Sequence, residues 1–177
     1  PGSAVLLASK TASASATLDF TEFVNATYSR YRFVLKAILP ATNAVYLTIR
    51  FSTDAGATYD AGASAYAFVA EGADSAGGNT TDSSNATTAI RITPNNAAAL
   101  ISSTGQGVFG EIIIYNAPSA TLKTRLSGQI DFDDSGSDFF VGTVGGRQAA
   151  ASDTDGLRFI MSSGNIASGT VEMWGMV

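Results

Sequence analysis

The chain has 177 residues, of which 45% are apolar and 14% are charged, and its formal net charge is −5; this predicts one folded domain with its own core. It contains no Cys and no His, which excludes a Ser-His-Asp triad, a Cys nucleophile, disulfides and zinc sites of the His/Cys kind. The negative charge argues against a nucleic-acid partner, and we expect no membrane insertion because no apolar run approaches the ~20 residues that span a bilayer.

The chain begins with Pro1-Gly2-Ser3, which resembles the remnant of a cleaved affinity tag. We therefore expect residues 1–3 to contribute nothing to the fold. Residues 4–177 are expected to form a single domain.

In four segments most of the apolar residues share one parity of the alternating positions, which is the pattern of antiparallel strands with one buried face. The expected core-facing residues are Tyr31, Phe33, Leu35, Ala37 and Leu39; Val45, Leu47, Ile49 and Phe51; Leu122, Leu126, Ile130 and Phe132; and Leu157, Phe159 and Met161. A fifth segment, Val108–Tyr115, is apolar on nearly both faces, with Glu111 the exception. It predicts either a central strand covered on both sides or a strand at a subunit interface.

Turn-forming residues separate these segments at short intervals, for example at Pro40–Asn43, Asp54–Gly56 and Ser163–Asn165. The chain shows no long amphipathic helix. Many strands with regular turn signals predict an all-β domain, either an antiparallel β-sandwich or a barrel, over residues 4–177.

The segment Glu71–Thr88 consists almost entirely of Gly, Ser, Thr, Asn and Asp. It predicts a long surface loop, which is either a tolerated insertion or a binding loop. The segment also contains the glycosylation sequons at Asn79 and Asn85, and a third sequon starts at Asn25. Such tripeptides arise by chance in a chain rich in Asn and Thr, so we do not expect glycosylation.

Residues Ser52–Tyr59 follow the pattern S-x-D-x-G-x-T-aromatic. This pattern resembles the Asp-box of sialidases and other carbohydrate-active proteins. Short polar side chains satisfy the amides of a tight turn, Gly permits a positive φ, and the aromatic ring packs beneath. The motif therefore predicts a structural turn rather than a binding site.

Residues Asp131–Asp138 resemble the first half of a calcium-binding loop, with the candidate metal ligands Asp131, Asp133 and Asp138. The twelfth position of such a loop is Gly142, where an EF-hand needs a bidentate Glu. Two interpretations remain: a solvated acidic hairpin without cofactor, or a Ca²⁺ site.

Glycoside hydrolysis needs two carboxylates held across a cleft. The chain has four Glu residues, and Glu111 lies within the most apolar segment, but no second carboxylate is positioned against it by the sequence. A carboxylate paired with an Arg explains Glu111 equally well. We therefore expect no enzymatic activity and assign no catalytic residue.

Exposed aromatic rings are the side chains on which sugars stack. Trp174 is the only Trp; if Val171 and Met173 face the core, Trp174 faces outward with Glu172. An outward Trp marks a sugar platform or a protein interface. Trp174, Tyr59 and Tyr66 are the candidate ligand-binding residues.

The C-terminal stretch 155–176, which reads DGLRFIMSSGNIASGTVEMWGM, resembles the "GIRF…SSGNIASGT…LYG" ending of a group of tailed-phage virion proteins. The segments 31–34, 39–42 and 47–62 are similar as well. The resemblance covers most of the chain from about Leu18, is weak over residues 71–88, and places Trp174 where the family has Tyr.

This resemblance implies a β-sandwich of jelly-roll type in a tail fibre, spike or head fibre of a tailed phage or phage-like particle. It implies a virion location, other virion proteins as partners, host attachment and a homo-oligomer, with a trimer favoured. Our main hypothesis is a non-enzymatic virion protein that contacts host-surface polysaccharide. The alternatives are a purely architectural virion protein and a carbohydrate-binding module of a larger enzyme.

Overall fold

The computed structural model describes residues 3–23, 27–97 and 99–177. Pro1 and Gly2 of the expected tag remnant lie outside the described residues, as do Asn25 and Ala26 of the first sequon. The described chain consists of strands joined by turns and loops. Within it, no helix is long and apolar enough to cross a membrane.

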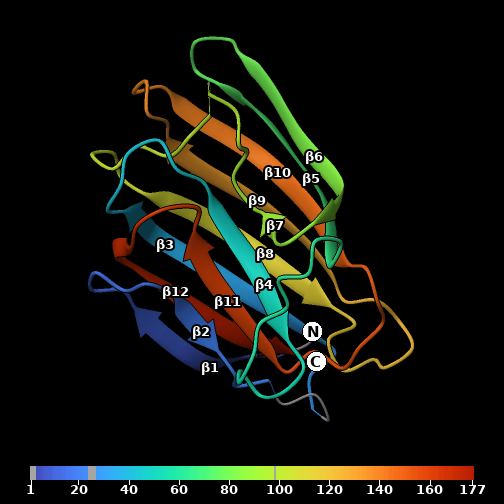
Figure 1. Ribbon diagram of the computed structural model, residues 1–177. Helices are drawn as coiled ribbons and strands as arrows, with labels where there is room; N and C mark the ends of the chain where they lie inside the picture. Colours follow the sequence, from blue (N-terminus) through green and yellow to red (C-terminus); the bar gives the residue numbers. More distant parts are fainter. Residues whose placement is uncertain (1–2, 24–26, 98) are drawn as a thin grey trace.

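The strands form two antiparallel sheets (Figure 1). The described residues form β1 (Ala4–Thr11), β2 (Leu18–Phe20), β3 (Arg30–Pro40), β4 (Leu47–Ser52), β5 (Tyr66–Asp74), β6 (Asn79–Thr87), β7 (Ile90–Arg91), β8 (Val108–Tyr115), β9 (Arg125–Asp133), β10 (Phe139–Gln148), β11 (Gly156–Met161) and β12 (Ile166–Met176). The large sheet has eight strands in the order β1-β12-β3-β8-β9-β10-β5-β6, and the small sheet has four in the order β2-β11-β4-β7.

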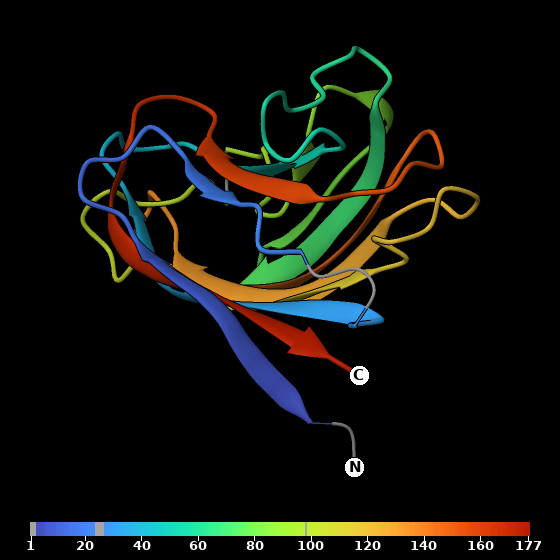
Figure 2. The same cartoon turned by 90° about the horizontal axis from the view of Figure 1, so that it is seen from below.

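The large sheet curves beneath the small one, and the core lies between them (Figure 2). Phe20 of β2, Phe33 of β3 and Phe159 of β11 meet there edge to face, with ring centroids 5.3 to 6.1 Å apart. Such aromatic contacts between facing sheets are typical of a sandwich core. The all-β antiparallel sandwich is therefore confirmed, whereas the jelly-roll connectivity stays a prediction.

The alternating pattern predicts the core strands of the small sheet correctly. Leu47, Ile49 and Phe51 of β4 are fully buried, and so are Leu157 and Phe159 of β11. These strands pair with one another, so their alternate side chains enter the core as a continuous layer.

In β3 the predicted stripe ends early. Tyr31, Phe33 and Leu35 are buried as expected, but Ala37 has a φ of 54° and the pairing with β8 shifts there. This β-bulge changes the parity, so that Ile38 is buried and Leu39 is only half-buried. The prediction of Leu39 as a core residue is wrong. A similar error affects Leu122, which precedes β9 and is 57% exposed.

The segment Glu71–Thr88 is not a loop. Most of it belongs to the β5–β6 hairpin, whose tight turn includes Gly77 at a φ of 92° and a hydrogen bond from the Gly78 N–H to Asp74. β6 is one of the two edge strands of the large sheet, and β1 is the other. The hydroxyl and amide side chains of β6 suit an edge, because polar edges resist pairing with other molecules.

Candidate functional site on the outer face of the large sheet

The segment Val108–Tyr115 forms β8, a central strand of the large sheet. Val108, Ile112 and Ile114 are buried in the sandwich core. The opposite face is open in the single chain, since Phe109 is 37% exposed and Glu111 is exposed too. The prediction that both faces of β8 are covered is thus wrong within one chain. The alternative, a strand at a subunit interface, stays a prediction.

The strand registers place outward residues of the large sheet in rows that run across the strands. The groove row contains Trp174, Arg32, Ile113, Ser127, Gly145, Val69 and Ser83. On one side lies the arginine row, which contains Arg30, Tyr115, Arg125, Arg147 and Ala67. On the other side lies the carboxylate row, which contains Glu172, Val34, Glu111, Gln129, Thr143, Glu71 and Thr81.

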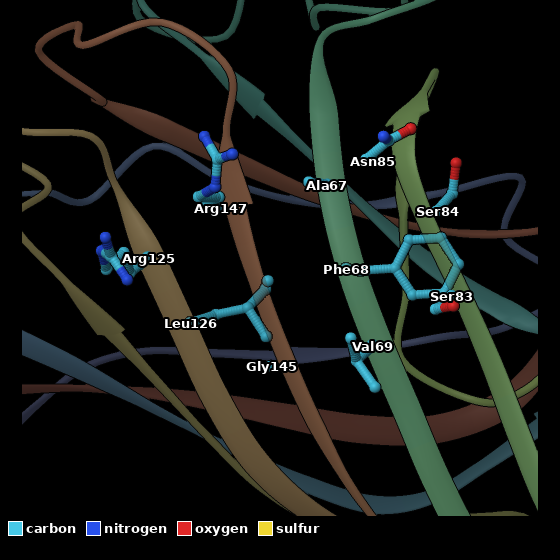
Figure 3. A pocket seen from close by; sticks show the side chains of 11 residues that line it. Ala67, Phe68, Val69, Ser83, Ser84, Asn85, Arg125, Leu126, Gly145 and Arg147 are labelled. Carbon is cyan, nitrogen blue, oxygen red and sulfur yellow. The ribbon is translucent and has the colours of Figure 1, made fainter.

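The middle of the groove row is hollow because its residues are small. At Gly145 an added Cβ would meet no atom within 4 Å. A hollow of about 840 Å³ opens there, between β9, β10, β5 and β6. Its outward-facing lining is Ala67, Val69, Ser83, Asn85, Arg125 and Arg147 (Figure 3).

A second hollow of about 370 Å³ adjoins the first, toward β8. It is lined by Glu111, Ile113, Gln129 and Thr143, with Ser127 beside Gly145 in the groove row. We call the two hollows together the groove. The groove crosses the strands, is open to solvent along its length, and has guanidinium groups on one side and carboxylate, amide and hydroxyl groups on the other.

Arg125 and Arg147 lie directly opposite one another on neighbouring strands. Within the part of the chain that the structure describes, neither guanidinium takes part in an ion pair or a hydrogen bond. Directly opposed like charges destabilise a sheet. The pair therefore has a cost in the free chain that no contact in the described structure offsets.

Trp174 faces outward from β12, as predicted, because Val171 and Met173 are fully buried. Its Nε1–H donates to Glu172 at 3.3 Å, and the guanidinium of Arg32 lies 5.4 Å from the ring centroid. Trp174 is in the groove row but is separated from Ile113 by Arg32. The ring thus extends the same face without lining the hollow itself.

The other two candidate aromatics lie elsewhere. Tyr66 is fully buried: its hydroxyl donates to the carbonyl of Asp60 at 3.0 Å and accepts from the N–H of Phe51 at 2.9 Å. Burial raises the pKa of Tyr66 to about 12. Tyr66 is a core residue, and its assignment to a ligand site was incorrect.

Tyr59 belongs to the Asp-box turn, which forms as its pattern predicts. Ser52 Oγ and the N–H and hydroxyl of Thr58 donate to Asp54, and the N–H of Gly56 donates to Ser52. The Thr58 hydrogen bonds lower the pKa of Asp54. These contacts account for the motif as a local turn.

The ring of Tyr59 packs beneath the guanidinium of Arg158 at 4.0 Å, and that guanidinium makes two hydrogen bonds to Asp19. Burial raises the pKa of Tyr59 to about 12. Tyr59 thus covers the small-sheet side of the molecule, and it shares no surface with Trp174.

The three candidate metal ligands, Asp131, Asp133 and Asp138, have different surroundings and hydrogen-bond partners. Asp133 accepts from the N–H of Gln106, and Asp138 accepts from Ser75 in the turn after β9. Asp131 faces outward, where burial and then the charge of Asp133 raise its pKa. Among the described residues, no three acidic side chains are grouped to hold a metal ion. The segment forms the acidic β9–β10 hairpin, and whether it ever binds Ca²⁺ stays untested.

Glu111 is the carboxylate within the apolar strand β8. Its side chain is 54% exposed and lies 3.7 Å from Arg32. Glu111 is thus paired with an arginine, as the alternative interpretation predicts. A pair this exposed contributes little stability.

Comparison of the chain with protein-family models, with curated proteins and with solved structures found no match. The resemblance to tailed-phage virion proteins, the absence of enzymatic activity, the partners and the virion location accordingly stay predictions.

Sequence reasoning missed the residues that shape the groove. In β9, Arg125 points to the other face of the strand from its buried neighbour Leu126. The alternating pattern therefore predicts that Arg125 faces outward. Its position beside Arg147 was not readable, because that depends on which strands pair and in which register. The same holds for the hollow at Gly145, which depends on the pairing of β10 with β9 and β5.

Proposed function

We propose that this chain is a non-catalytic binding domain that holds a polysaccharide in the groove of the large sheet. In this proposal the domain is displayed on a fibre or spike of a phage or phage-like virion and contacts host-surface glycan. The observation that carries the proposal is the open groove across the outer face, with its floor at Gly145 and Ser127.

A groove of this shape suits a long polar chain better than a small molecule. Small-molecule sites are enclosed and mostly apolar, whereas this groove is open at the surface and flanked by Arg125, Gln129, Thr143 and Asn85. Guanidinium, amide and hydroxyl groups are the donors and acceptors that sugar hydroxyls need. The outward ring of Trp174 in the same row adds a stacking surface for a chain that continues past β3.

Contacts of this kind are individually weak, so the proposal includes multiplicity. Several copies on one particle bind a repetitive polymer with an avidity far above the affinity of one groove. A homo-oligomer, with a trimer expected, would provide the first level of that multiplicity. Light scattering of the purified chain tests the oligomeric state.

The architectural alternative has its own support. Val141 is 52% exposed and Phe139 is 50% exposed, and both face outward from β10 near the exposed Phe109 of β8. Exposed apolar side chains gathered on one face are typical of protein interfaces. In this alternative the large sheet packs against another virion protein, and the chain has no glycan ligand.

The test is a polysaccharide panel presented to bead-multimerised protein, with Gly145→Leu as the decisive variant. The open space at Gly145 lets a leucine enter the groove without contacting the protein core. Ala76→Leu adds a leucine to the exposed β5–β6 turn outside the groove and is the control. We expect the wild type and Ala76→Leu to retain a polysaccharide that Gly145→Leu loses. If the folded wild type retains none, the binding proposal fails and the architectural alternative stands.

A further inference from the structure

We infer that the groove selects anionic polysaccharides, and that Arg125 and Arg147 together hold a carboxylate or phosphate group of the polymer. This inference rests on the proposed function and names its ligand class. The observation that supports it is the cross-strand pair of Arg125 and Arg147, which is independent of the shape of the groove.

Three other arginines form ion pairs with carboxylates, whereas Arg125 and Arg147 form none in the described structure. Arg91 pairs with Asp82 at 3.0 Å, Arg158 with Asp19 at 2.6 Å, and Arg32 lies 3.7 Å from Glu111. The chain has an excess of acidic residues, with 15 Asp and Glu against 10 Lys and Arg. Among the described residues Arg30 and Arg50 form no ion pair either, but Arg125 and Arg147 are two such arginines placed directly side by side.

The register makes Arg125 and Arg147 neighbours, and the surroundings keep them available. Within the arginine row, Arg125 is flanked by Tyr115 and Arg147 by Ala67, neither of which carries negative charge. The nearest row is the groove row, where Ser127 and Gly145 stand beside them. An oxyanion in the hollow therefore meets two guanidinium groups and no carboxylate on that side.

Guanidinium groups suit this ligand for geometric reasons. Each presents a planar fork of N–H donors that matches the two oxygens of a carboxylate or phosphate. Ser83 and Asn85, on the opposite wall of the hollow, add neutral polar groups. A bound anion would also remove the repulsion between Arg125 and Arg147, so the interaction gains from a cost already present in the free protein.

The charge on the two sides of the groove also orients the ligand. Glu111 and Glu71 lie in the carboxylate row, across the groove row from the arginines. An anionic substituent on that side would face like charge. The polymer is therefore expected to turn its acidic groups toward Arg125 and Arg147 and its hydroxyl groups toward Gln129 and Thr143.

The experiment compares four probes on the wild type: alginate for carboxylate, poly(glycerol phosphate) for phosphate, dextran as the neutral polymer, and a DNA duplex as a polyphosphate that is not a polysaccharide. The test variant is R125Q/R147Q. The control K10Q/R50Q removes the same charge outside the groove, since Lys10 pairs with Glu22 and Arg50 lies on the small sheet. Thermal unfolding of every variant confirms that each is folded.

We expect the wild type to bind alginate or poly(glycerol phosphate) more tightly than dextran, and the preferred probe to identify the anion. R125Q/R147Q should lose about tenfold or more of that affinity, because each lost contact is a charge-assisted hydrogen bond. K10Q/R50Q should bind as the wild type does. Added salt should weaken binding to the wild type and have little effect on R125Q/R147Q.

Three results would overturn the inference. Dextran bound as tightly as the anionic polymers, and lost only in Gly145→Leu, would leave the polysaccharide groove in place but remove its anion selectivity. Equal binding of a DNA duplex through the same arginines would make the site a general phosphate site. A change of oligomeric state in R125Q/R147Q, without any change in polymer binding, would assign the arginine row to a contact between copies of this chain.

Discussion

Removal of the hydroxyl group from each of two tyrosines tests how much the hydrogen bonds of a buried hydroxyl contribute to the stability of the fold. Tyr66→Phe removes a hydroxyl that accepts from the N–H of Phe51 and donates to the carbonyl of Asp60 in a fully buried position. Tyr59→Phe removes a hydroxyl that is buried without a hydrogen-bond partner among the described residues. The chemistry of the two substitutions is the same, so their difference isolates the hydrogen bonds.

The magnitude follows from the groups left behind. Tyr66→Phe leaves the buried N–H of Phe51 unpaired, which costs about 1–3 kcal/mol. Tyr59→Phe removes a buried hydroxyl whose desolvation no hydrogen bond in the described structure offsets, so the substitution is expected to be neutral or to stabilise the chain by up to about 1–3 kcal/mol. For a chain of this size, 1 kcal/mol shifts Tm by about 2–4 °C. Tyr66→Phe should therefore melt several degrees below Tyr59→Phe.

The assay is thermal and urea unfolding of the wild type and both variants at neutral pH. Equal destabilisation by the two substitutions would refute the reasoning, because it would mean that the hydrogen bonds of Tyr66 contribute no more than an unpaired hydroxyl. Loss of polysaccharide binding in folded Tyr66→Phe would also contradict the assignment of Tyr66 to the core.

Three further predictions follow from the same structure. Because burial raises the pKa of Tyr66 from 10.0 to about 12, the unfolded state loses this proton first, and stability should fall between these pH values, less so in Tyr66→Phe, as alkaline unfolding measures. Gly107→Ala should destabilise the chain, because Gly107 has a φ of 82° and an added Cβ would lie 2.7 Å from the carbonyl carbon of Ala37; urea unfolding measures it. Arg147→Gln should stabilise the free chain by about 0.2–1 kcal/mol at low salt, because it removes the charge opposite Arg125, and this gain should disappear in calorimetry at high salt.

The period of two in the sequence was sufficient for the fold class where one face of a strand is apolar and the pairing is regular. β4 and β11 meet both conditions, and their buried residues match the prediction. β3 meets the first condition only, since the bulge at Ala37 exchanges its two faces. The close approach of Gly107 to Ala37 accompanies that bulge, and it joins segments that the sequence does not place side by side.

The hairpin from Glu71 to Thr87 shows the opposite limit. Its edge strand β6 has almost no apolar residue, so hydrophobic periodicity had nothing to detect. The strand is held by backbone pairing to β5, which any polar sequence permits. Composition alone therefore predicts a loop where the sheet has its last strand.

For the candidate site, the parity argument was correct for Trp174 because its neighbours Val171 and Met173 are strongly apolar. For Tyr66 the ring alone favours a stacking role, whereas its place in β5 buries it in the core. The groove itself depends on residues from β5, β6, β8, β9 and β10. Its prediction requires the order of strands in the sheet, which a single sequence does not contain.

The most direct test of the central claim is a backbone amide NMR titration of the wild-type chain with a short oligosaccharide of whichever polymer it retains. The account predicts chemical-shift changes centred on Ser127, Gly145 and Val69, which extend to Arg125 and Arg147 when the ligand is anionic. Shift changes confined to the small sheet or to the Asp-box turn at Asp54, with the groove unperturbed, would contradict it.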